Sequence, residues 1–178
     1  MDSWAQQLDP DLRQGDVVDL LPIAVPKVPL RGTEPSGKDR VWREVELPAG
    51  AVYAERHLIV AATVRPALVL SHCCELEKQT KRKSNSRKPI LIAPFVRLED
   101  VGAGDREAIR QQRQWGAYYA GDVPGAGEGY FNLRGATAID RSLVEQRKKL
   151  ASMTDRARDG LKVRLIAFFT RIGADDLE

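Results

Sequence analysis

Short apolar stretches separated by proline and glycine mark the first hundred residues and predict β-strands. The clearest is the nearly continuous apolar run at 65–71, which is typical of a buried strand. The residues expected to form strands in this part of the chain are 12–20, 41–47, 57–63, 65–71 and 89–96. Short strands at such close spacing favour a small twisted barrel or sandwich.

Three segments lack this pattern. Pro22, Pro26 and Pro29 exclude a helix and leave at most an irregular edge strand. Residues 31–39 and the glycine-rich residues 121–129 have the composition of loops. The sequence therefore places its irregular parts between the predicted strands.

Helices are expected in the second half. Residues 105–118 contain good helix formers and predict a helix that ends near Gly116. Asp140 is placed to cap a short helical turn, and Ser152 to cap a longer terminal helix. An apolar stripe follows Ser152 at steps of four, four, four and three residues: Met153, Ala157, Leu161, Leu165 and Phe168. This stripe favours a core-facing helix, with a dimer contact as the alternative.

Composition limits the class of protein. The chain has 178 residues, 43% of them hydrophobic and 30% charged, which is typical of one globular domain. It shows no secretory signal and no apolar run near the ~20 residues of a membrane span. The two cysteines, Cys73 and Cys74, are adjacent, and neighbouring cysteines rarely form a disulfide with each other. We therefore expect a cytoplasmic protein that does not associate with membranes.

Charge is unevenly distributed, although the net charge is only +3. Between positions 78 and 88 there are six cations and no anion: Lys78, Lys81, Arg82, Lys83, Arg87 and Lys88. Such a segment is either a solvated loop or an electrostatic groove or lid for phosphates. It contains no aromatic residue, so base stacking within it is not indicated.

The segment Ser71–Glu75 carries the densest set of reactive side chains. Strand alternation places Ser71 and Cys73 on one face and His72 and Cys74 on the other. One hypothesis is a Cys74 or Cys73 nucleophile with His72 or His57 as base, followed by the acid Glu75. The alternative is a small buried cysteine beside a hydrogen-bonded histidine. Consecutive ligands cannot easily converge on a metal, so neither a metal nor a cofactor is expected.

Three separated pieces of the chain resemble the PemK-like toxins, the MazF-type RNA interferases. These pieces are Gly15-Asp16-Val17-Val18, the strand at 64–71 followed by the strand at 90–95, and the tail from Leu133 to the terminal helix. The resemblance implies an α+β, mainly β fold, with a small SH3-like β-barrel and a C-terminal helix. It also implies that the chain forms a homodimer and cleaves single-stranded RNA without metal. An antitoxin-like protein is the implied partner. On this comparison, residues 1–178 form one domain with insertions at about 21–57 and 100–129.

The same resemblance implies two parts of a reaction centre. The family's arginine falls on Arg65, whose guanidinium would stabilise charge on the phosphorus or protonate the leaving oxygen. The family's threonine falls near Val96, which has no hydroxyl. His72 is one candidate to replace that hydroxyl as acid or base. The function hypotheses are thus an endoribonuclease, an inactive nucleic-acid- or protein-binding module of the same fold, and a cysteine-nucleophile enzyme.

Overall fold

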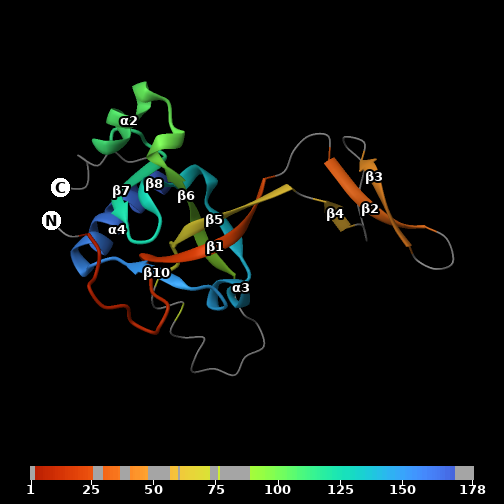
Figure 1. The fold of residues 1–178 in the computed structure, drawn as a ribbon, viewed down its shortest axis with the longest axis horizontal. Coiled ribbons are helices and arrows are strands. Elements are labelled where there is room, and N and C mark those ends of the chain that lie inside the picture. The colour runs from red at the N-terminus through yellow and green to blue at the C-terminus, as the bar shows by residue number, and fades with distance from the viewer. Residues whose placement is uncertain are drawn as a thin grey trace. The chain divides into compact units, whose positions relative to one another are not determined.

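The computed structural model describes residues 3–25, 30–36, 41–47, 57–59, 61–72, 76 and 89–170 (Figure 1). The chain divides into two compact units. The first contains Met1–Leu21 and Arg65–Glu178, and the second contains Pro22–Val64. The insertion predicted at about 21–57 lies largely within the second unit, while the assignment of the whole chain to one domain stays a prediction.

A curled antiparallel sheet, half of a barrel, forms the first unit (Figure 1). Across the sheet the strands are β10 (Lys149–Ser152), β1 (Asp16–Val25), β5 (Ala61–Val69), β6 (Ile90–Arg97), β8 (Gly127–Asn132) and β7 (Ala117–Val123), and β9 (Thr137–Ile139) pairs with β6. The helices are η1 (Leu98–Asp100), α2 (Ala103–Arg110), η2 (Leu133–Gly135), α3 (Arg141–Glu145) and α4 (Asp155–Thr170). This arrangement confirms the predicted α+β, mainly β class. None of the helices in the described ranges is long and apolar enough to cross a membrane.

The second unit contains a sheet of three strands, in which β2 (Leu30–Ser36) lies between β3 (Val41–Leu47) and β4 (His57–Ile59). The strand predicted at 41–47 is confirmed. The loop predicted at 31–39 is wrong as far as Ser36, because β2 pairs with β3 along seven residues, from Leu30↔Leu47 to Ser36↔Val41. Backbone pairing here outweighs a composition that is rich in turn-forming residues.

The predicted stripe of α4 faces the core. Leu161 is fully buried, and Ala157, Leu165 and Phe168 pack against the same cluster, which includes Phe131. The predicted cap is wrong: α4 begins at Asp155, whereas Ser152 belongs to β10. The cap of α3 is confirmed, because the Asp140 carboxylate accepts a hydrogen bond from the Ser142 amide at 2.8 Å.

The middle of the chain differs from expectation in two places. The helix predicted to end near Gly116 ends at Arg110. The loop predicted at 121–129 is instead part of the β7–β8 hairpin. Gly121, Gly125 and Gly127 adopt positive φ angles of 70°, 77° and 87° there. These glycines make the turn and an irregularity in pairing, while the strands continue around them.

Candidate functional site

The structure places Ser71 and His72 just beyond the end of β5. The Ser71 hydroxyl accepts a hydrogen bond from the Leu91 amide at 2.9 Å, which fixes it against β6. His72 is exposed, and its carbonyl oxygen accepts from the Leu76 amide at 3.3 Å. Cys73, Cys74 and Glu75 lie outside the described residues, so the cysteine-nucleophile hypothesis stays a prediction.

The basic segment predicted to bind nucleic acid also lies outside the described residues: Lys78, Lys81, Arg82, Lys83, Arg87 and Lys88. Its proposed contact with phosphates stays a prediction as well.

Arg65 lies in β5 away from the Ser71–His72 end of that strand. The strand is extended from Ala61 to Val69, and the four residue steps from Arg65 to Val69 span about 13 Å. The structure therefore does not bring Arg65 together with Ser71 or His72.

Arg65 instead falls in line with residues of β6 and β8. The antiparallel register Ala67↔Pro94 and Leu68↔Ala93, continued toward the start of β5, sets Arg65 opposite Val96. On the other edge of β6, Val96 pairs with Tyr130, and Tyr130 pairs with Tyr119 of β7. Directly opposite residues in a sheet share a face. We call these four half-buried residues (Arg65, Val96, Tyr130 and Tyr119) the cross-strand row.

The electrostatics of Tyr130 agree with this placement. Burial raises the pKa of the Tyr130 hydroxyl above its usual value of 10.0, while the positive charge of Arg65 acts to lower it and Asp105 of α2 acts to raise it. Both charged groups are therefore close enough to Tyr130 to affect its proton. At neutral pH the phenol keeps that proton, within range of the charge of a permanently ionised guanidinium.

The cross-strand row lies on the face of the sheet opposite the main core. Phe95 and Phe131, the neighbours of Val96 and Tyr130 along their strands, are buried in the core with ring centroids 5.4 Å apart. The core face of β7 is marked by Tyr118, whose hydroxyl donates to the Ala157 carbonyl of α4 at 3.3 Å. Alternation therefore separates the row from α4.

The face that carries the row is bordered by α2. Ile109 of α2 is buried with Leu98 and Ala117, and Tyr119 and Tyr130 pack against this small cluster. In Figure 1, α2 lies at the β7–β8 end of the sheet. The segment around α2 thus supports the two tyrosines and supplies the nearby carboxylate of Asp105.

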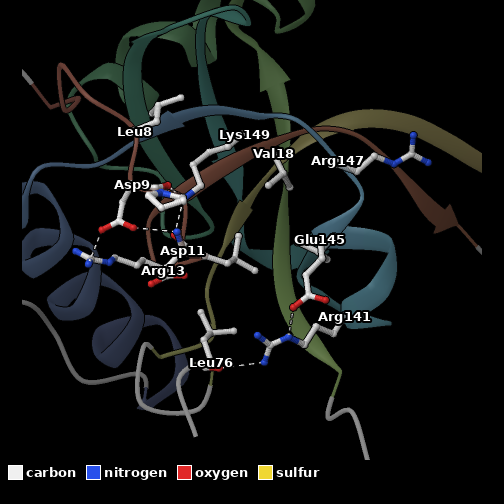
Figure 2. A pocket seen from close by; sticks show the side chains of 13 residues that line it. Leu8, Asp9, Asp11, Arg13, Val18, Leu76, Arg141, Glu145, Arg147 and Lys149 are labelled. Atoms are coloured by element: carbon white, nitrogen blue, oxygen red, sulfur yellow. Dashed lines mark hydrogen bonds and ion pairs between the residues drawn. The ribbon is translucent and has the colours of Figure 1, made fainter. Parts of the chain in front are cut away.

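A pocket of about 560 Å³ lies elsewhere, between the N-terminal residues 8–13 and α3 (Figure 2). Its walls are about equally polar and apolar, and it is large enough for a small ligand. Its buried cations are engaged by the protein itself. Arg141 pairs with Glu145 at 2.5 Å and donates to the Leu76 carbonyl at 3.0 Å. Lys149 pairs with Asp16 at 2.6 Å and donates to the carbonyls of Asp9 and Asp11.

The bonds of Arg141 to Leu76 and of Lys149 to Asp9, Asp11 and Asp16 join segments that are far apart in the sequence, so these two cations serve mainly to close the fold. A second pocket, of about 450 Å³, carries Glu99, Asp122 and Glu128 beside Arg97, and Arg97 pairs with Glu99 at 3.1 Å. Its negative charge does not suit a phosphate. Neither pocket combines an arginine and a tyrosine hydroxyl on one face of the sheet, as the cross-strand row does.

Within the described ranges, no three histidine, cysteine or acidic side chains are grouped so that they could hold a metal ion. The sequence indicated Arg65 and the missing hydroxyl at Val96, but it did not indicate Tyr130 and Tyr119 as candidates. The sequence did contain one usable signal: alternation along a strand at 130–131 places Tyr130 and Phe131 on opposite faces of the sheet. Models of known protein families gave no match to the chain, and comparison with curated proteins also gave no match.

Proposed function

We propose that the chain is a metal-independent endoribonuclease of single-stranded RNA, a divergent relative of the PemK-like toxins, with its reaction centre at Arg65 and Tyr130. The observation that carries the proposal is the position of Tyr130. It stands next to Val96, where the family resemblance calls for a hydroxyl, and its phenol is within reach of the charge of Arg65. A hydroxyl on the neighbouring strand would replace the missing threonine.

The fold gives separate support. A curled half-barrel followed by the terminal helix α4 is compatible with an SH3-like barrel of the PemK type. The homodimer and the antitoxin-like partner belong to the proposal as expectations of the resemblance. The long insertions distinguish this chain from the usual pattern, and one of them contains α2.

Metal-independent cleavage needs three groups from the protein: one that stabilises charge at the phosphate, one proton donor and one proton acceptor. The 2′-oxygen of a ribose attacks the neighbouring phosphorus, the bond to the 5′-oxygen breaks, and a 2′,3′-cyclic phosphate and a 5′-hydroxyl remain. Arg65 stabilises the charge that develops on the phosphorus oxygens. Tyr130, whose pKa is raised by burial, donates its proton to the departing 5′-oxygen.

The 2′-hydroxyl proton requires an acceptor, and we assign this role to the exposed carboxylate of Asp105. Its charge acts on Tyr130, so it lies within electrostatic range of that phenol. The tyrosinate and the protonated carboxylate left after one turnover exchange a proton through solvent, which restores both groups. No metal or other co-reactant takes part in this sequence.

The test is incubation of long single-stranded RNA with purified protein in EDTA, followed by gel and end-group analysis. We expect the wild type to cleave and to leave 2′,3′-cyclic phosphate ends. Arg65→Ala and Tyr130→Phe should each reduce the rate about 10²-fold or more. Matched controls are Arg156→Ala, at an exposed arginine of α4, and Tyr118→Phe, on the core face of β7. Both should cleave like the wild type.

Absence of cleavage by the wild type, or equal cleavage by all five proteins, would overturn the proposed reaction. RNA binding without cleavage would favour the inactive binding module instead. Cleavage that persists in Tyr130→Phe but not in Arg65→Ala would reject the role assigned to Tyr130.

A further inference from the structure

Tyr119 is the residue of the cross-strand row that the proposed reaction leaves without a role. It stands directly opposite Tyr130, one strand farther from Arg65. Neighbouring strands are about 4.8 Å apart, so Tyr119 lies about 14 Å from Arg65 across the sheet and about 5 Å from Tyr130. A group held at Tyr119 would therefore be next to the phosphate position.

The hydroxyl of Tyr119 is occupied. It donates to Glu128 Oε1 at 2.7 Å, and Arg110 of α2 binds both oxygens of the same carboxylate at 2.9 and 3.1 Å. The Arg110 guanidinium lowers the pKa of Glu128, so the carboxylate stays ionised. Burial and Glu128 together raise the pKa of Tyr119, which keeps its proton in this bond. Tyr119 is thus a poor acid or base for the reaction.

The backbone of Tyr119 is fixed as well. Its amide donates to the Gln112 side chain at 3.3 Å, and its carbonyl accepts from the same side chain at 3.1 Å. The ring is therefore held at both ends, by Glu128 at the hydroxyl and by Gln112 at the backbone. What remains free for binding is the exposed part of a pre-oriented aromatic ring.

We infer that Tyr119 stacks a nucleobase of single-stranded RNA whose phosphate is bound at Arg65 and Tyr130. Aromatic rings bind unpaired bases by stacking, with little dependence on base identity. A rigid ring loses little conformational freedom when a base stacks on it. This inference rests on the proposed function, and it gives the α2 insertion a specific task, because Arg110 and Gln112 hold the ring in place.

The test uses short RNA with 2′-O-methyl riboses, whose blocked 2′-oxygens prevent cleavage, and with 2-aminopurine as a fluorescent base. Stacking quenches this fluorophore, so binding by the wild type should quench it. Tyr119→Leu keeps an apolar side chain but removes the ring, and should weaken binding about ten-fold and abolish most of the quenching. Tyr119→Phe keeps the ring and should remain within about two-fold of the wild type in affinity, with its quenching intact.

Arg65→Ala separates the two proposals. It should lose cleavage of ordinary RNA while still quenching the fluorophore at saturating protein. Binding of the RNA to the wild type without quenching would by itself overturn the stacking inference. Wild-type affinity and quenching in a folded Tyr119→Leu variant would also overturn it, and would leave the proposed cleavage standing. Quenching without any cleavage would reject the reaction and keep the stacking site.

Discussion

Asp16 is the most completely engaged charged residue in the described part of the chain. It is fully buried at the start of β1 and accepts from the Ser152 hydroxyl at 2.5 Å and the Arg13 amide at 2.7 Å. Lys149 pairs with it at 2.6 Å. These partners come from β10 and from the segment before β1, so one carboxylate joins N-terminal and C-terminal parts of the chain at one edge of the sheet. The Gly15-Asp16 pair of the sequence pattern is thus a structural feature and lies outside the proposed reaction centre.

Replacing Asp16 with Asn should destabilise the fold by about 3–5 kcal/mol, because the Lys149 ammonium would stay buried without a counter-charge. Urea unfolding at neutral pH measures this change. The matched control is Asp155→Asn, since Asp155 also pairs with an arginine, at 2.9 Å, but is 96% exposed. That change should cost about 1 kcal/mol or less. Equal effects of the two substitutions would contradict the assignment.

The raised pKa of Tyr118 makes the free energy of unfolding depend on pH in the alkaline range. Burial raises its pKa above the usual value of 10.0. Because the folded pKa is higher than the unfolded one, this phenol contributes its full stability below about pH 10, and the contribution is lost as pH rises through the folded pKa. Urea unfolding between pH 8 and pH 11 should therefore show a steeper alkaline loss for the wild type than for Tyr118→Phe. Parallel curves would show that Tyr118 does not titrate with folding.

At the scale of elements, alternation and capping residues in the sequence predicted much of the fold. They predicted β3 at 41–47, the start of α3 after Asp140, and the core face of α4. The errors at β2 and at the β7–β8 hairpin share one cause. Glycine and proline indicate loops locally, whereas in both places a neighbouring strand provides backbone partners that the local sequence does not show.

For a similar reason the sequence indicated Arg65 of the candidate site but not Tyr130. Arg65 stands in a recognisable strand pattern, but its relation to Tyr130 depends on the register of three strands that are distant in sequence. Register is set by the whole sheet and its turns. The sequence shows that Val96 lacks a hydroxyl, but it does not show that Tyr130 is the neighbour of Val96 across the strands.

Gly129 allows β8 to approach β6 next to Tyr130. A Cβ at this position would lie within 3 Å of the Phe95 ring and of the Val96 carbonyl oxygen. Gly129→Ala should therefore destabilise the protein by about 1–3 kcal/mol, since backbone must move to admit it.

The matched control for that substitution is Gly160→Ala in α4. Outside the backbone of its own helix, a Cβ there meets no atom within 4 Å, so the alanine should stabilise the helix by about 1 kcal/mol. Opposite signs in thermal unfolding are expected for the two variants. A neutral Gly129→Ala variant would contradict the tight β6–β8 contact.

At the scale of the whole molecule, a small net charge of +3 conceals a local concentration of cations. Binding of RNA by phosphate contacts should therefore weaken steeply as salt is added, with a slope of about −0.7 per phosphate neutralised on a single strand. Fluorescence anisotropy across a salt series measures the slope. Arg65→Ala should make it shallower by about 0.7, whereas Arg156→Ala should leave it unchanged. Salt-independent affinity would contradict a phosphate-binding surface.

The measurement that tests the central claim most directly is RNA cleavage in EDTA by Tyr130→Phe alone and combined with Val96→Thr. If the hydroxyl function lies on Tyr130 because Val96 lacks it, Tyr130→Phe should lose about 10²-fold in rate. The added Val96→Thr, which supplies a hydroxyl one strand away and next to Arg65, should recover at least about ten-fold of that loss. A double variant as inactive as Tyr130→Phe, or a Tyr130→Phe variant as active as the wild type, would contradict this account.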